Sequence, residues 1–146
     1  MSIELVSYAR LLEQTALLEE YAAECSIPEI GKATPNPAIY AAMETAGLLQ
    51  CFMAWHMERV VGFASVLLPV MPHYSVRVST VESIFVTQSA RNTGIGGWLM
   101  KAVEDFARDH GCAVVLWSAP TGGQFERVLS RNKRYRQTNS VFACNP

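Results

Sequence analysis

The fold of this chain is decided at Arg91-Asn92-Thr93-Gly94-Ile95-Gly96-Gly97. The preceding run, residues 80–86, is rich in β-branched and aromatic residues and predicts a strand. After the glycines, apolar residues recur at helical spacing from Trp98 to Ala107, and Gly111 predicts the end of that helix. A glycine-rich turn between a strand and a helix lets the backbone approach a ligand closely. Because free N–H groups and the positive end of the helix dipole meet there, the stretch is typical of a phosphate-binding site.

Two other phosphate-binding loops do not match this glycine-rich stretch. No Lys-Ser or Lys-Thr pair follows the glycines, which excludes a Walker A loop. The spacing Gly94-x-Gly96 lacks the third glycine of the dinucleotide-binding fingerprint, and no acidic residue follows about twenty positions later in a second strand. A tight turn without a ligand is the alternative that the motif alone leaves open.

The motif Arg91-x-x-Gly94-x-Gly96 resembles the Gln/Arg-x-x-Gly-x-Gly/Ala signature of the GNAT superfamily, the CoA-dependent N-acyltransferases. The approach from Val86 to Arg91 resembles the family's Val-x-Pro-x-x-Arg segment, with Gln88 in place of the common Pro. The resemblance implies an α/β (α+β) fold, a GNAT-like single domain over residues 1–146, with a central mixed, mostly antiparallel twisted sheet flanked by about four helices. It also implies an N-acetyltransferase that moves an acetyl group from acetyl-CoA to a primary amine by direct transfer in a ternary complex.

Length and composition agree with one globular domain. The chain has 146 residues, half of them hydrophobic, and a formal net charge of -1. It shows no apolar run near the roughly 20 residues of a membrane span and no signal peptide, so we expect a cytoplasmic protein without a membrane partner. The four cysteines are scattered without a Cys-x-x-Cys pair and form no ligand cluster with the three histidines. Reduced thiols and no metal site are therefore expected.

Positive charge gathers near the C-terminus, where residues 127–136 hold five basic side chains and no acidic one. A solvated helix end explains this cluster, and so does attraction of anionic phosphates, including those of CoA. A nucleic-acid-associated protein is a weaker alternative, because only Tyr135 supplies an aromatic ring inside the cluster.

Periodicity and turn residues predict the order of the elements. Strands are expected at 3–6, 49–57, 60–70, 77–86, 113–117 and 141–144, with a hairpin turn at Glu58-Arg59. Helices are expected at 11–22, 38–46 and 124–130, in addition to the long helix after the glycines. Asn36 is the expected N-cap of the second of these, with Pro37 at its first position.

The resemblance also implies roles for single residues. Glu82 stands where several family members carry an acidic residue and is the candidate general base, with an outward-facing strand carboxylate as the alternative. An alkyl ammonium has a pKa of about 10.4, so freeing its lone pair at pH 7 costs roughly 4–5 kcal/mol, and a carboxylate can accept that proton directly or through water. The backbone N–H of Val86 would stabilise an oxyanion at the thioester carbonyl. The expected cofactor-binding residues are Phe85, Val86, Arg91, Asn92, Thr93, Gly94, Ile95, Gly96 and Gly97.

The last helix departs from the family pattern. Many relatives carry a Tyr there that protonates the leaving CoA thiolate, and aligning Arg134-Tyr135 with the family's Gly-Phe pair puts Ser130 at that position. Tyr135 is the nearest substitute and the candidate catalytic acid, with core packing as its alternative role; Tyr74 is a second candidate. A thiolate with a pKa of about 8.5 is a tolerable leaving group even without a dedicated acid.

The expected acceptor is a small-molecule or peptide amine, bound between the first two helices, their loop and the last strands. The candidate substrate-binding residues there are Glu29, Tyr40, Trp55 and His73, although exposed Glu usually serves solubility and aromatic residues usually pack. Many relatives are dimers, so a homodimer is compatible with the resemblance. A catalytically silent acyl-CoA-binding or regulatory domain is the alternative function, because the usual Tyr is replaced.

Overall fold

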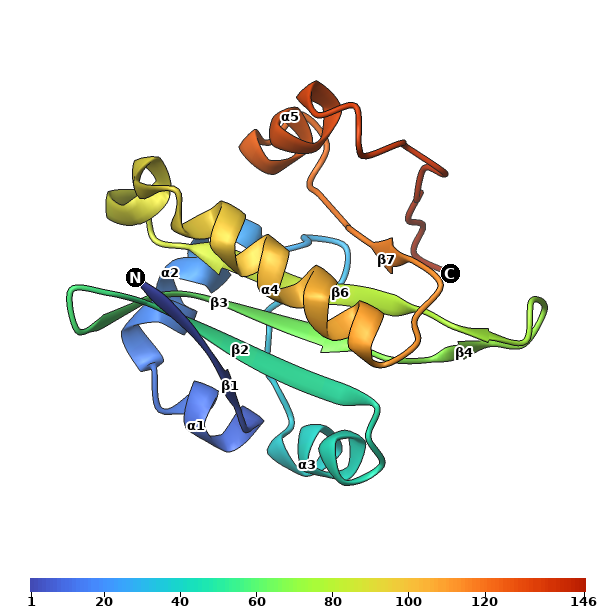
Figure 1. Ribbon diagram of the computed structural model, residues 1–146, viewed down its shortest axis with the longest axis horizontal. Helices are drawn as coiled ribbons and strands as arrows, with labels where there is room; N and C mark the ends of the chain where they lie inside the picture. Colours follow the sequence, from blue (N-terminus) through green and yellow to red (C-terminus); the bar gives the residue numbers. More distant parts are fainter.

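The computed structural model describes residues 1–146, with helices packed on both faces of a twisted sheet (Figure 1). In chain order the elements are β1 (Ser2–Val6), α1 (Tyr8–Leu12), α2 (Thr15–Cys25), α3 (Pro37–Thr45), β2 (Leu49–His56), β3 (Arg59–Leu67), β4 (Val70–Met71), β5 (Val76–Arg77), β6 (Ser79–Val86), the 3-10 helix η1 (Gln88–Thr93), α4 (Ile95–Asp109), β7 (Val115–Leu116) and α5 (Gln124–Arg131). None of these helices combines the length and the apolar character needed to cross a membrane.

The sheet is mixed and mostly antiparallel, as predicted. Its five strands follow the order β1-β2-β3-β6-β7, in which only the last pair is parallel. The parallel pairing is short, because β7 meets only Ser79 and Thr80 at the start of β6. Residues 81–86 of β6 therefore have no strand neighbour on that side, which leaves an open edge on the side of β6 that faces away from β3. The short strands β4 and β5 form a separate ribbon that projects from the body (Figure 1).

Two hydrophobic clusters hold the helices to the sheet. On the α4 face, Ile95, Leu99 and Val103 are fully buried at a spacing of four residues, which places them on one side of the helix. On the opposite face, residues of α1 and α2 pack with β2, β3 and β6. Full burial of one such aliphatic side chain contributes about 1.5–3 kcal/mol. The two clusters fix β6 between the two layers of helices.

The helix predicted at 11–22 is two helices in the structure, α1 and α2, with a break at Glu13 and Gln14. The break has a packing reason. Leu11 and Leu17 both lie in the same buried cluster, yet at about 100° per residue they would point to different sides of one continuous helix.

Two further predictions need correction. The hairpin between β2 and β3 turns at Met57 and Glu58, both with positive φ (47° and 62°), and not at Glu58-Arg59. The closing strand predicted at 141–144 is wrong, because these residues pair with no strand, and the Val141 and Phe142 side chains are 89% and 91% exposed. An apolar, β-prone run fits a strand only where an edge is available beside it.

Candidate active site

A β-bulge in β6 determines where Glu82 points. In the register between β3 and β6, Ser65 lies opposite Ser83 and Val66 lies opposite Val81, so Glu82 is the extra residue. Such a bulge changes the direction of a side chain that the strict alternation of a strand would place on the other face. Glu82 and Ser83 consequently reach the same polar cluster on the α1–α3 face, while Val81 packs against α4.

Three hydroxyl groups surround the Glu82 carboxylate. The Tyr40 hydroxyl donates to Oε1 at 3.1 Å. The Ser65 hydroxyl donates to Oε2, and the Ser83 Oγ lies 3.0 Å from the same oxygen. Glu82 itself is exposed, so the carboxylate combines a fixed geometry with access from solvent. A carboxylate held in this way can accept a proton from a bound group.

Tyrosine rings form the wall beside this carboxylate. The rings of Tyr8 and Tyr40 stack with centroids 3.7 Å apart and an interplanar angle of 3°. Burial, followed by the charge of Glu82, raises the pKa of Tyr40, and the same two causes raise the pKa of Tyr21 to about 12. These phenols therefore stay protonated at neutral pH and act there as neutral hydrogen-bonding groups.

The open edge of β6 ends at Val86, which lies opposite Gly62 of β3. At the next pair, the Thr87 N–H donates to the Val61 carbonyl at 2.8 Å. Because bonded and non-bonded pairs alternate in an antiparallel ladder, the N–H and C=O of Val86 point away from β3. The Val86 carbonyl accepts instead from Arg91 Nε at 3.0 Å. The Val86 N–H thus faces the open edge, as an oxyanion-stabilising donor would require.

The side chain of Arg91 has partners within the protein. Besides the Val86 carbonyl, its guanidinium forms an ion pair of 2.6 Å with Glu24 of α2 and lies 5.4 Å from the centre of the Phe85 ring. Arg91 thereby ties the end of β6 to α2. Its charge is shared with a carboxylate, so the backbone of the glycine-rich stretch is better placed than this side chain to receive a phosphate.

The glycine-rich stretch begins α4 without an acidic residue to compensate the positive end of the helix. Gly94 has φ 85°, a left-handed conformation that favours glycine, and as the N-cap residue it has no side chain to accept a helix N–H. The first turn of α4 has no acidic residue. A Cβ added at Gly97 would meet no atom within 4 Å, so packing does not explain why residue 97 is glycine. Asn92 is exposed, and Thr93 Oγ1 accepts from the Ile95 N–H at 3.4 Å. The helix start can therefore hold an anion such as a pyrophosphate.

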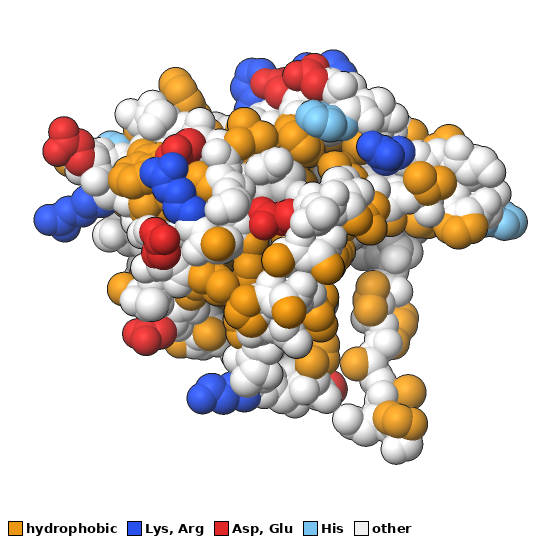
Figure 2. Space-filling view, turned by 90° about the horizontal axis from the view of Figure 1, so that it is seen from below, with side chains coloured by type: hydrophobic (Ala, Val, Ile, Leu, Met, Phe, Trp, Pro, Cys, Tyr) orange, Lys and Arg blue, Asp and Glu red, His pale blue; other side chains and the backbone are white.

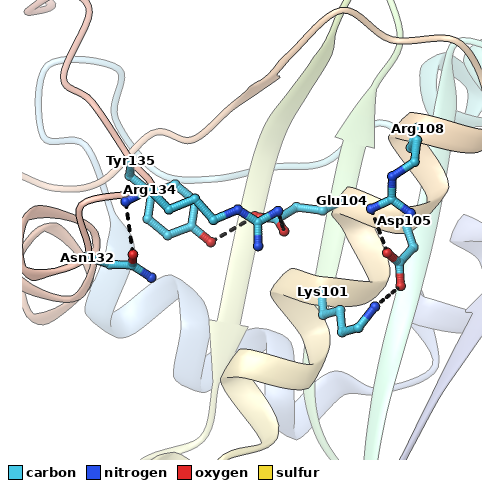
Figure 3. A network of polar contacts seen from close by, with 7 residues as sticks. All are labelled: Lys101, Glu104, Asp105, Arg108, Asn132, Arg134 and Tyr135. Atoms are coloured by element: carbon cyan, nitrogen blue, oxygen red, sulfur yellow. Dashed lines mark hydrogen bonds and ion pairs between the residues drawn. The ribbon is translucent and has the colours of Figure 1, made fainter.

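Tyr135 lies away from Glu82, against α4. Figure 3 shows its hydroxyl donating to Glu104 Oε1, at 2.8 Å, while Arg134 pairs with the other oxygen of Glu104 at 2.6 Å. Burial, followed by the Glu104 contact, raises the pKa of Tyr135 to about 12. These residues line a pocket of about 340 Å³ that extends from Gly97 along α4 toward α5. Tyr135 therefore has a structural partner, and Ser130 is exposed on α5.

Of the predicted substrate-binding residues, the structure brings only Tyr40 to Glu82. Trp55 donates from Nε1 to Glu4 at 3.0 Å, which is a structural contact. His73 lies on the β4–β5 ribbon against Tyr74. Glu29 lies in the exposed loop between α2 and α3, where its carbonyl accepts from Asn145 at 3.3 Å.

Sequence reasoning missed three residues of the Glu82 cluster: Ser65, Ser83 and Tyr8. A serine inside each of two adjacent apolar strands was the available signal, because buried hydroxyls need partners. Charged side chains of both signs are interspersed around the face seen in Figure 2, and no continuous basic area covers it. No group of three or more His, Cys, Asp or Glu side chains is arranged to hold a metal ion.

Comparison with known families identifies the chain. Residues 14–124 match the model of the acetyltransferase (GNAT) family, which is more than half of the 146 residues. The chain belongs to the GNAT family of acetyltransferases. It is accordingly an acyltransferase enzyme with the GNAT-like α+β fold that the resemblance implied. A search by sequence among curated proteins gave no match.

Solved structures of other acetyltransferases share this GNAT fold at low sequence identity. An aminoglycoside acetyltransferase from an uncultured soil metagenomic sample, in complex with trehalose, is 15% identical with a TM-score of 0.78, over 99% of this chain and 95% of its own. A ribosomal-protein-alanine N-acetyltransferase from Brucella melitensis biovar Abortus 2308 is 19% identical with a TM-score of 0.77, over 99% and 96%. The aminoglycoside N-acetyltransferase AAC(6')-Iy in complex with CoA is 19% identical with a TM-score of 0.73, over 99% and 98%.

Proposed function

We propose that this GNAT protein, as one domain over residues 1–146, transfers an acetyl group from acetyl-CoA to a primary amine directly within a ternary complex. The observation that carries the proposal is the arrangement on β6. This strand presents the Glu82 carboxylate on its bulge and, four residues later, the outward N–H of Val86 on its open edge. A proton acceptor and an oxyanion donor on one rigid strand are what amide formation from a thioester requires.

The glycine-rich stretch fits the phosphates of CoA. The start of α4, where the Thr93 hydroxyl is the one side-chain acceptor and the first turn has no acidic residue, and the free space at Gly97 support a pyrophosphate over the backbone of residues 91–97. The open edge at Val86 fits an amide group of the pantetheine arm, which would bind as an added strand does. When bound, acetyl-CoA supplies the activated acetyl group as a thioester.

Glu82 is the proposed general base. An acceptor amine reaches the active site mainly as an ammonium, and the exposed carboxylate attracts that cation and accepts its proton, directly or through water. The Tyr40 hydroxyl, which comes from α3, contacts the Oε1 atom of Glu82. The amine would therefore approach Glu82 between α3 and β6. Structures with the same fold include an aminoglycoside acetyltransferase and a ribosomal-protein-alanine N-acetyltransferase, which supports a small-molecule amine or a peptide amine as the acceptor class.

The experiment is a continuous assay of free thiol released from acetyl-CoA, run with a panel of aminoglycosides, polyamines and peptide N-termini. We expect release with at least one amine class. Glu82→Gln should then lower kcat by ~10²-fold or more at neutral pH, with KM for acetyl-CoA unchanged, and raising the pH should recover part of the rate.

The negative outcomes separate the alternatives. CoA binding without thiol release for any amine would instead support a catalytically silent acyl-CoA-binding domain. Unchanged turnover in Glu82→Gln would assign the proton transfer to water or to a group on the substrate.

A further inference from the structure

Two buried serines hold one oxygen of the Glu82 carboxylate. Ser65 of β3 is 2% exposed and Ser83 of β6 is 9% exposed, yet both hydroxyls contact Oε2 of the exposed Glu82. The two Oγ atoms are also 2.5 Å apart. They lie opposite each other across the β3–β6 ladder, so the backbone of two strands fixes both of them.

The number of hydroxyl protons determines which atoms of this cluster donate and which accept hydrogen bonds. Each serine has one hydroxyl proton. Ser65 donates to the carboxylate, and Ser83 donates either to the same oxygen or to the Ser65 Oγ. Oε2 is an acceptor in both arrangements. Its partners are buried and point toward the strands, so an incoming amine cannot replace them.

The other oxygen, Oε1, has a different environment. Its only hydrogen-bond partner is the hydroxyl of Tyr40, which comes from α3 and belongs to neither strand. With Oε2 occupied on the buried side, Oε1 is the oxygen that faces the acceptor side. A carboxylate with one fixed and one accessible oxygen has a defined direction for proton acceptance, which a freely rotating glutamate on a strand lacks.

We propose that Ser65 and Ser83 are positioning residues of the acetyl-transfer reaction, which orient Glu82 so that Oε1 accepts the proton of the acceptor amine. This inference rests on the proposed function of Glu82. It adds that the bulge in β6 and the serine on the neighbouring strand act together. The bulge alone would bring the Glu82 carboxylate to this face without fixing the rotation of its side chain.

The test compares Ser65→Ala and Ser83→Ala with Ser79→Ala. Ser79 is a fully buried serine of the same strand whose hydroxyl has no hydrogen-bond partner, so it is a matched control outside the cluster. We expect kcat to fall about 10-fold in each of the first two variants, with KM for acetyl-CoA unchanged, and to stay the same in the control. The deficit should shrink at high pH, where the amine is already neutral.

A double-mutant cycle with Glu82→Gln separates positioning from general stability. If the serines act through the carboxylate, Ser65→Ala should have no further effect on kcat in the Glu82→Gln background. An equal loss in both backgrounds, or no loss in the wild-type background, would overturn the proposal. Unchanged turnover in Glu82→Gln alone would instead reject the role of Glu82 in the proposed function.

A conservative variant keeps the test decisive if an alanine variant fails to fold. Ser83→Thr retains the hydroxyl and adds a methyl group at a strand position that accepts β-branched residues. We expect its kcat to stay within about twofold of wild type while Ser83→Ala does not. Equal activity of the Thr and Ala variants, both folded, would show that the Ser83 hydroxyl is not needed.

Discussion

Tyr135 is the residue for which a structural role and a catalytic role can be distinguished most directly. Its hydroxyl donates to Glu104, and its pKa is raised to about 12, which makes it a weak acid at neutral pH. We expect Tyr135→Phe to leave kcat unchanged and to lower the free energy of unfolding by about 1–2 kcal/mol, because Glu104 loses a partner. Urea unfolding and thiol release measure the two effects. A fall in kcat with the fold intact would make Tyr135 the catalytic acid.

Single residues show where sequence reasoning ends. Glu82 was a candidate because several members of the GNAT family carry an acidic residue at its position, and the structure places it on an accessible bulge. Tyr40 lies 42 positions away in the sequence and Ser65 lies 17 positions away. No local pattern relates residues at such separations, and the register shift that joins them depends on the pairing of two strands.

The start of α4 offers a test at the scale of an element. Gly97 has helical backbone and open space around it, so Gly97→Ala should raise the free energy of unfolding by about 0.4–1 kcal/mol. The same methyl group should weaken CoA binding about 10-fold or more, because it stands where the pyrophosphate would approach the backbone. Thermal melting and calorimetry with CoA measure the opposed effects. Unchanged CoA affinity would move the phosphate site away from this helix start.

The pairing of β3 with β6 depends on another glycine. A Cβ at Gly62 would lie 2.6 Å from the Phe85 carbonyl and 3.1 Å from a methyl group of Val86. We expect Gly62→Ala to destabilise the fold by about 1–3 kcal/mol, because the backbone must separate. Displacement of the Val86 N–H should also lower kcat, and by a larger factor than it changes KM for acetyl-CoA. The measurement is kcat, corrected for the fraction of the variant that is folded. A corrected kcat equal to that of the wild type would contradict the role of the Val86 N–H.

Elements with strong local signals were predicted well. The strand, glycine turn and long helix from residue 79 to 109, the N-cap Asn36 and the helix α5 are all present. The break between α1 and α2 and the absence of a strand at 141–144 were not predicted. Both depend on what lies beside the segment in space. The break lets α1 and α2 pack on the same hydrophobic cluster, and residues 141–144 have no strand beside them to pair with.

The whole molecule should lose stability at alkaline pH. Burial raises the pKa of Cys51 from 9.0 to about 12, and the pKa values of Tyr21 and Tyr135 rise from 10.0 to about 12. These groups ionise at lower pH in the unfolded chain, so the native state binds more protons between pH 9 and 12. The stability that they contribute is complete below pH 9 and is lost as the pH rises toward 12.

Urea unfolding at a series of pH values measures this loss. Cys51→Ala, which removes the thiol whose pKa rises to about 12, should make the decline above pH 9.0 less steep than in the wild type. A free energy of unfolding that stays constant from pH 8 to about pH 11 would contradict the expectation.

The location of Glu82 and Val86 on a single strand has a consequence for how this protein can diversify. When the sheet flexes, β6 carries both groups along together, so their mutual spacing is insensitive to that motion, whereas their spacing to Tyr40 on α3 is not. Substitutions in α1, α2 and α3 at positions other than Glu24 and Tyr40 can therefore reshape the proposed acceptor side without disturbing the pair. In such an architecture the chemistry proposed for β6 and the choice of acceptor proposed for the helices are separable, so we expect a change of acceptor to arise from substitutions in the helices.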